Sequence, residues 1–208
     1  MVTIFATLGW EPKSVIPSLK IRDNVEKLIV YHSPDKKGED AWQKLWGYCS
    51  SIKLPLKSVK LENQFDLIKT AKEIRKDLRK YAGKDIVFNI TGGTKVMSSA
   101  ALLACILEAV PAVYCNEKTG KEETLPLLQI RYEDFLTKPQ KNILTVIKQL
   151  GGECNAVDIA KKTGLRKATV SHHIKQLGDM GLVVVETSKK DSRKKSVKLL
   201  ESVELLLE

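Results

Sequence analysis

The stretch from residue 84 to residue 99, KDIVFNITGGTKVMSS, restricts the possible fold more than any other part of the chain. Residues 86–90 form a short, almost wholly apolar run of β-forming residues, which is typical of a strand covered on both faces in a parallel sheet. Two glycines follow, and from Val96 onward the sequence is rich in alanine and leucine, as expected of a helix. The glycines therefore lie between a strand end and a helix start, where open α/β folds bind ligands.

This junction favours an anionic ligand. Glycine lets another molecule approach the main chain, and the free N–H groups and dipole at a helix start attract negative charge. Lys95 adds a full positive charge. The spacing is neither that of a Walker loop nor that of a GxGxxG turn, and an ordinary tight turn with a solvated lysine is the alternative interpretation.

The segments on both sides of the junction alternate between strand and helix patterns. The predicted strands are residues 2–8, 27–32, 56–61, 86–90, 112–115 and 124–128, and the predicted helices start near Glu11-Pro12 or span residues 40–51, 66–82 and 96–110. This order predicts a mostly parallel, doubly wound, Rossmann-like α/β sheet with an antiparallel hairpin at one edge. The first strand ends at Gly9-Trp10, so two glycine junctions at one carboxyl edge can line one pocket.

The helix predicted at residues 66–82 has the clearest period, and its outer face is basic. A basic stripe of this kind is typical of a solvated helix face, so we do not interpret it as a nucleic-acid surface. Its members are Lys69, Lys72, Arg75, Lys76, Arg79 and Lys80.

The character of the sequence changes after residue 136. Residues 1–136 contain 21 basic and 17 acidic side chains, a net charge of +4, whereas residues 137–208 contain 14 and 8, a net charge of +6. The charge is concentrated in the shorter C-terminal part, which indicates a polyanionic partner. We expect two domains, residues 1–136 and residues 137–208.

The C-terminal part has the pattern of a winged helix-turn-helix. Three helical segments, residues 140–150, 156–163 and 166–178, precede two strand segments, residues 182–187 and 196–200. In this motif the second helix of the helix-turn-helix enters the major groove of double-stranded DNA. The third helical segment here would bury Val170, Ile174 and Leu177 and leave a polar face outside.

The residues expected to contact DNA lie on that polar face and on the hairpin tip. The tip has five basic residues in the seven positions 189–195, which would gain affinity by counterion release. Winged helices also serve as protein-interaction modules, which is the alternative. The predicted DNA contacts are Arg166, Lys167, Thr169, Ser171, His172, Lys175, Lys189, Lys190, Arg193, Lys194 and Lys195.

Cysteine and histidine spacing excludes the common metal sites. The four cysteines, Cys49, Cys105, Cys115 and Cys154, are widely spaced without a CxxC pair, and we expect free thiols in a reducing cytosol. His172 and His173 would point about 100° apart on a helix and do not suit one ion. The most apolar helix is too short to span a bilayer and no signal sequence precedes the first strand, so we expect a cytoplasmic protein with no membrane partner.

These features together resemble the CARF-domain winged-helix transcriptional regulators of CRISPR antiviral defence. The likeness covers most of the chain by architecture, but at motif level only residues 89–98, with NxTGGTK, match. It implies a homodimer whose paired loops form one pocket for a cyclic oligoadenylate second messenger, commonly cyclic tetra-adenylate, with no other cofactor. It further implies that the pocket is lined by Leu8, Gly9, Trp10, Asn89, Thr91, Gly92, Gly93, Thr94, Lys95 and Ser98.

Three functions follow from this pattern, and the first is the leading hypothesis. It is a regulator in which nucleotide binding between two sensor domains changes the spacing of two winged helices. The rival is a ring nuclease that uses the same pocket, with Lys95 stabilising the transition state while a ribose 2′-OH attacks its own phosphate. The third is an adaptor that binds neither nucleotide nor DNA. Linear products from cyclic tetra-adenylate would distinguish the second function from the first.

Overall fold

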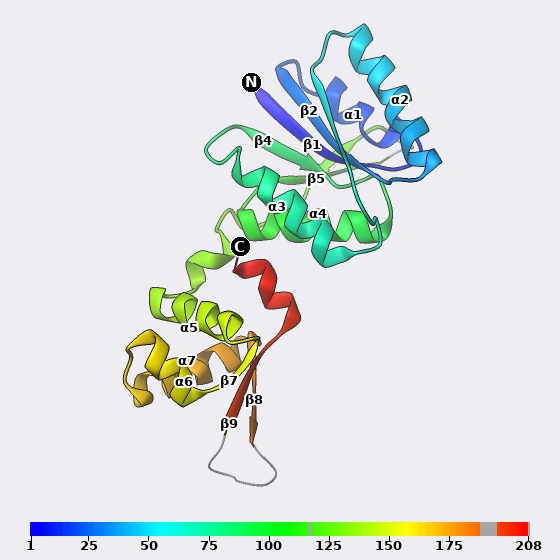
Figure 1. The fold of residues 1–208 in the computed structure, drawn as a ribbon. Helices are drawn as coiled ribbons and strands as arrows, with labels where there is room; N and C mark the ends of the chain where they lie inside the picture. The colour runs from blue at the N-terminus through cyan, green and yellow to red at the C-terminus, as the bar shows by residue number, and fades with distance from the viewer. Residues whose placement is uncertain (117, 188–194, 208) are drawn as a thin grey trace. The chain divides into compact units, whose positions relative to one another are not determined.

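A six-stranded sheet forms the centre of residues 1–132 (Figure 1). The computed structural model describes residues 1–116, 118–187 and 195–207. The spatial order of the strands is β3-β2-β1-β4-β5-β6, and every neighbouring pair is parallel except β5 and β6. The predicted doubly wound, Rossmann-like sheet with an antiparallel edge is therefore confirmed. The strands are β1 Val2–Leu8, β2 Val25–His32, β3 Leu56–Lys60, β4 Ile86–Asn89, β5 Ala112–Cys115 and β6 Glu122–Thr124.

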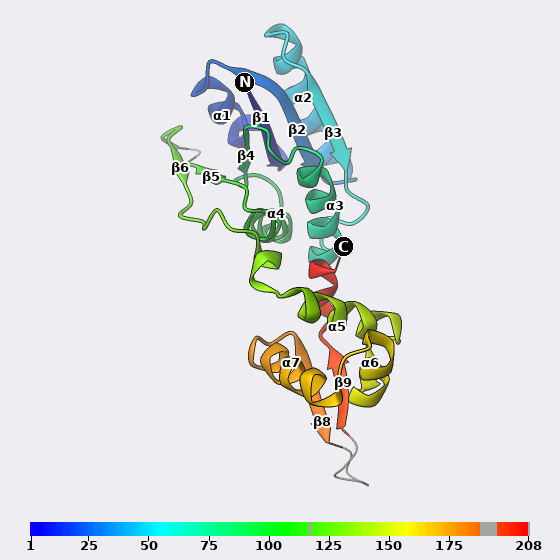
Figure 2. The ribbon, with the colours of Figure 1, turned by 90° about the vertical axis from the view of Figure 1, so that its left-hand side faces the viewer.

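Two helical layers cover the two faces of this sheet (Figures 1 and 2). The central strand β1 is buried along its whole length, so its side chains enter two different cores. Ile4 and Leu8 pack with residues of α1 and α2, whereas Phe5 packs with residues of α3 and α4. The helices are α1 Ile16–Lys20, α2 Lys36–Ser51, α3 Leu67–Arg79 and α4 Lys95–Glu108, and a 3₁₀ turn, η1 Pro12–Ser14, precedes α1.

The chain reverses its direction of travel across the sheet between β1 and β4. It moves outward from β1 to β2 and β3, returns to pair β4 with β1, and then moves outward on the other side through β5 and β6. The carboxyl ends of β1 and β4 thus flank the topological switch point, which is the usual ligand site of such sheets.

Several predicted boundaries in residues 1–132 are wrong, including those of β2, α2 and β6. The strand β2 starts at Val25 rather than residue 27, and α2 starts at Lys36 rather than residue 40, because the Asp35 carboxylate caps it by accepting from the Gly38 N–H at 2.8 Å. The strand predicted at residues 124–128 is β6 at Glu122–Thr124. The turn closed by the Asn116 N–H on the Lys121 carbonyl brings these earlier residues opposite β5.

The prediction that the basic face of α3 is solvated is wrong for Arg75. This residue is only 4% exposed, and its Nη2 and Nε lie 2.6 Å and 2.7 Å from Oε1 of Glu108, which is 6% exposed. Arg79 Nε donates to the same oxygen at 2.9 Å. The buried pair fastens α3 to the last turn of α4.

Residues 133–208 form a winged helix. A three-stranded antiparallel sheet of order β7-β9-β8 packs with three helices around one apolar core. The boundary falls between residues 132 and 133, four residues before the predicted one, because Leu136 already belongs to this core. The short strand β7 was not predicted. The elements are α5 Lys138–Gln149, β7 Glu153–Asn155, α6 Ala156–Thr163, α7 Lys167–Asp179, β8 Val183–Thr187, β9 Lys195–Leu199 and η3 Glu201–Leu206.

Replacing Glu108 with alanine tests the buried pair between α3 and α4. Arg75 would keep its charge in a buried site without its carboxylate, and breaking such a pair costs about 3–5 kcal/mol. We expect the free energy of unfolding of residues 1–132 to fall by this amount. Trp10, Trp42 and Trp46 all lie in these residues, so a denaturant titration followed by tryptophan fluorescence reports this unit.

The matched control is Glu123→Ala, which removes a carboxylate from an exposed position of β6. This change should shift the free energy of unfolding by no more than about 0.5 kcal/mol. A loss below about 1 kcal/mol for Glu108→Ala would contradict the structural role of the pair.

Candidate functional site

The loops that follow β1 and β4 enclose a cavity at the switch point. Its volume is about 570 Å³. The loop after β2 contributes one residue, Ser33, so three neighbouring strand ends meet there. The lining residues are Leu8, Gly9, Trp10, Glu11, Lys13, Ser14, Ser33, Thr91, Gly92, Gly93, Thr94 and Met97.

The two loops touch one another, and only glycine permits this contact. A side chain built on Gly92 would place its Cβ 2.4 Å from the carbonyl oxygen of Thr7 and 2.7 Å from Oγ of Ser14. Gly93 has a φ of 87°, in the left-handed region that favours glycine. The glycine pair therefore allows the loop after β4 to lie directly against the end of β1.

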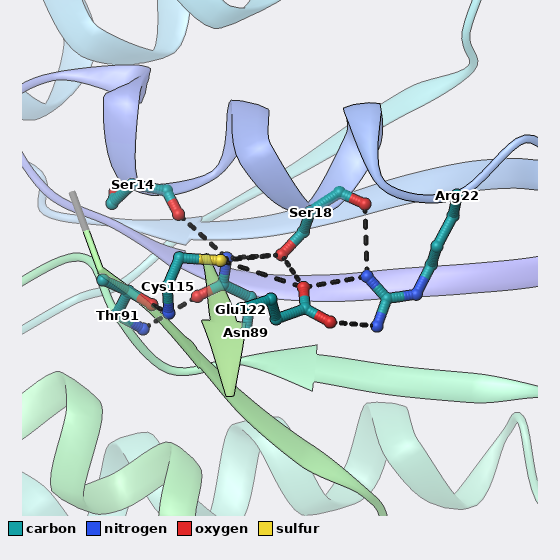
Figure 3. Close-up of polar contacts among 7 residues, drawn as sticks. All are labelled: Ser14, Ser18, Arg22, Asn89, Thr91, Cys115 and Glu122. Carbon is teal, nitrogen blue, oxygen red and sulfur yellow. Dashed lines mark hydrogen bonds and ion pairs between the residues drawn. The ribbon is translucent and has the colours of Figure 1, made fainter. Parts of the chain in front are cut away.

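Asn89, the last residue of β4, connects this loop to the segment that follows β1 (Figure 3). Its side-chain Nδ2 donates to the Ser14 carbonyl and to Ser18 Oγ, both at 2.9 Å, and its Oδ1 accepts from the Thr91 N–H at 2.9 Å. Asn89 is fully buried. One amide thus joins the strand end, the helix α1 and the first residue of the loop.

The same network extends to the β5–β6 hairpin (Figure 3). Thr91 Oγ1 accepts from the Cys115 N–H at 2.7 Å, and Ser18 Oγ donates to Glu122 at 2.5 Å. Arg22 forms a two-pronged ion pair with the same carboxylate. Burial acts to raise the pKa of Glu122, but the hydrogen bonds from Arg22 and Ser18 outweigh it and hold that pKa below its usual value. The Arg22–Glu122 pair therefore fixes the position of the Ser18 hydroxyl, which accepts a hydrogen bond from Asn89.

The helix α4 begins at the edge of the cavity. Thr94 caps it by accepting from the Met97 N–H at 3.1 Å, and the Thr94 hydroxyl donates to the Gln64 carbonyl at 3.1 Å. Ser98 Oγ donates back to the Gly92 carbonyl at 3.1 Å. The positive end of a 14-residue helix is thereby fixed beside the glycine loop.

One buried hydroxyl at the cavity wall has no partner. Among the described residues, Ser14 Oγ and Thr7 Oγ1 are the buried side-chain oxygens without a hydrogen bond, and Ser14, which is 1% exposed, lines the cavity. Buried polar atoms are nearly always paired, so this hydroxyl has capacity for a further hydrogen bond.

Seven of the residues assigned to the pocket from the sequence line this one cavity. They are Leu8, Gly9, Trp10, Thr91, Gly92, Gly93 and Thr94. The other three do not line it: Asn89 lies buried below the loop, Ser98 braces the Gly92 carbonyl, and Lys95 is exposed on the first turn of α4.

Sequence reasoning missed five lining residues. Glu11, Lys13 and Ser14 directly follow Gly9-Trp10, so a longer window after the first strand would have included them. Ser33 follows β2 at the same edge, and Met97 is buried one turn into α4.

In the winged helix, α7 presents the polar face that the sequence predicts. Val170 and Leu177 are fully buried and Ile174 is 5% exposed, as expected. Arg166 occupies the N-cap position without a side-chain capping hydrogen bond, and Thr169 is half-buried. The remaining predicted contacts on this helix, Lys167, Ser171, His172 and Lys175, are exposed. Lys195 begins β9, whereas Lys189, Lys190, Arg193 and Lys194 lie outside the described residues.

The described residues contain no cluster of three or more histidine, cysteine or acidic side chains that could hold a metal ion. The four cysteines are free, and burial raises the pKa of Cys49 to about 11 and also raises that of Cys115. These two thiols are therefore protonated at neutral pH. Within the described part of the chain, no helix is long and apolar enough to cross a membrane.

Solved structures similar to this chain match about a third of it. BpsR of Bordetella bronchiseptica, whose DNA binding is regulated by 6-hydroxynicotinic acid, is 31% identical over 36% of this chain and 56% of its own, with a TM-score of 0.34. A MepR-like protein complexed with pseudoligands is 30% identical over 34% and 51%, with a TM-score of 0.31. A mutant of S. aureus MepR bound to an oligodeoxyribonucleotide is 26% identical over 35% and 53%, with a TM-score of 0.33. The chain thus spans about half the length of these structures.

Two families match successive parts of the sequence, and no curated protein matches it. Residues 136–195 match the MarR family. Residues 2–127, which contain the whole sheet and the cavity, match the Csa3 CRISPR-associated Rossmann-like domain. The resemblance to CARF-domain winged-helix regulators of CRISPR systems is confirmed, and the chain belongs to the Csa3 family of CRISPR-associated Rossmann-like domains, here followed by a MarR-type winged helix.

Proposed function

We propose that this chain is a CRISPR-associated transcriptional regulator whose DNA binding is controlled by a cyclic oligoadenylate. The ligand, cyclic tetra-adenylate, binds in the cavity of residues 1–132, and the winged helix binds double-stranded DNA. The observation that carries this proposal is the junction of two glycine loops and a helix start in a chain that also holds a winged helix.

The cavity has the chemistry that a phosphodiester ring needs. Backbone N–H groups of the loop at Gly92 and Gly93 and the start of α4 supply partial positive charge. Lys13 lines the cavity, and Lys95 is available on the adjacent helical turn. The unpartnered hydroxyl of Ser14 adds a neutral donor.

A homodimer would match the symmetry and size of such a ring. A cavity of about 570 Å³ is typical of a pocket for one small ligand and accommodates only part of a ring of four nucleotides. Two copies related by a two-fold axis would supply two equal half-sites. The ring would then contact both protomers, and its binding would depend on their relative orientation.

DNA binding is supported by the outer face of α7. Lys167, Ser171, His172 and Lys175 are exposed there, opposite the buried Val170 and Leu177. Polar side chains of this helix would read base edges, and the basic residues at positions 189–195 would contact phosphates.

The same cavity leaves cleavage of the ring as the second candidate function. A carboxylate and an ammonium group, Glu11 and Lys13, lie 3.5 Å apart on its wall. The positive charge of Lys13 near the scissile phosphate would stabilise the negative charge that develops as a ribose 2′-OH attacks. Linear fragments from labelled cyclic tetra-adenylate would establish the nuclease, whereas an intact ring supports the sensor.

Replacing Lys95 with alanine tests the anion site. Lys95 is exposed, so its loss should leave the fold intact and remove one charge-assisted phosphate contact. Such a contact contributes about 1.5–3 kcal/mol, so calorimetry should show at least roughly tenfold weaker binding of cyclic tetra-adenylate.

The control is Lys84→Ala, because Lys84 is also exposed but precedes β4 at the opposite end of the same strand. We expect this variant to bind the ring as tightly as the wild type. Equal binding by both variants would contradict the assigned anion site.

Replacing Lys190, Lys194 and Lys195 with alanine tests whether the wing, the basic hairpin tip predicted at positions 189–195, contacts DNA phosphates. The slope of log K against log salt concentration is negative, and each lost phosphate contact reduces its magnitude by about 0.9. The magnitude should therefore fall by up to about 2.7 per protomer. Fluorescence anisotropy with duplex DNA at several salt concentrations measures it. The control carries the same change of charge, with exposed Lys20, Lys44 and Lys84 of residues 1–132 replaced by alanine, and should keep the wild-type slope. An unchanged slope in the wing variant would exclude phosphate contacts by these three lysines.

A further inference from the structure

Trp10 stands at the edge of the cavity with most of its surface exposed. It follows Gly9 in the loop after β1, lines the cavity and is 63% exposed. An exposed apolar side chain is common by itself. Trp10 differs from an ordinary exposed apolar residue because a side chain of another element, the helix α2, contacts its indole ring.

Lys37, in the first turn of α2, lies over the Trp10 ring. Its Nζ is 3.9 Å from the ring centroid, within the range of a cation–π interaction. This helix is capped by Asp35, and the Asp35 carboxylate also accepts from the hydroxyl of Ser33, another cavity residue, at 3.1 Å. The indole, in the loop after β1, is therefore contacted by a side chain of the helix that follows β2.

The two sides of the cavity offer different chemistry. The glycine loop and the start of α4 suit phosphate, whereas the indole offers a flat aromatic face. Stacking on an aromatic side chain is a common way to bind a nucleobase without pairing its edge. One nucleotide can thus place its phosphate at the glycine loop and its base at Trp10.

We propose that Trp10, held by Lys37, is the base-stacking platform of this cavity and gives it a preference for purine over pyrimidine nucleotides. This inference rests on the proposed function, because it assumes that a cyclic oligonucleotide occupies the cavity. Lys37 covers one face of the indole, and the base stacks on the other. Purines have the larger ring system, so they gain more from this contact.

The test compares Trp10→Ala, Trp10→Phe and Lys37→Met with the wild type. Cyclic tetra-adenylate and cyclic tetra-uridylate are titrated by calorimetry at one salt concentration. Loss of a stacking platform should weaken cyclic tetra-adenylate binding about 5- to 150-fold and weaken cyclic tetra-uridylate binding less, which lowers the purine preference. Trp10→Phe should recover part of the affinity. Lys37→Met should weaken cyclic tetra-adenylate binding about two- to fivefold.

The matched control is Trp46→Ala. Trp46 is similarly exposed, at 56%, but it lies on α2 outside the cavity lining. It should keep both affinities, and thermal melting of all variants verifies folding. If the wild type binds the adenylate ring and Trp10→Ala keeps the wild-type affinity and purine preference, the platform is wrong and the proposed function stands. If the wild type binds neither ring, both are wrong.

Discussion

The contact between the loop after β4 and the end of β1 is the constraint on which the candidate site depends. Gly92 lies so close to the Thr7 carbonyl that any side chain would separate the loops. The parallel pairing of β1 with β4 creates this proximity, and Asn89 fixes it by hydrogen bonding Ser14 in η1, Ser18 in α1 and the loop. The cavity is therefore a consequence of the strand order.

The polar network below the cavity gives the loop a definite position. Thr91 connects it to β5, and Ser18 connects Asn89 to the ion pair of Glu122 with Arg22. Because buried polar groups are costly when unpaired, a shift of the loop would have to rearrange several of these bonds together.

Much of this architecture could be predicted from sequence because it depends on local patterns. The apolar run of β4, the glycine pair and the period of α3 specify the sheet, the loop and the covering helices. The partners of polar residues could not be predicted in this way. Arg75 belongs by period to a basic face, and its burial depends on Glu108, 33 residues later.

In the candidate site, too, the partners of polar residues could not be predicted from local sequence patterns. The side chain of Asn89 points to Ser14, 75 residues earlier, rather than into the cavity, which no local pattern reveals. To predict that Ser33 lines the cavity, one would have to know that β2 ends at the same edge of the sheet as β1 and β4. The strand β7, with three residues, is too short to show a period.

The proposed control of DNA affinity by occupancy of the cavity is tested most directly by measuring the dissociation constant for duplex DNA with and without saturating cyclic tetra-adenylate. Linkage predicts a change of about 5- to 150-fold in the wild type, and a matching change in ring affinity when DNA is saturating. Identical DNA affinities with and without bound ring would contradict the account.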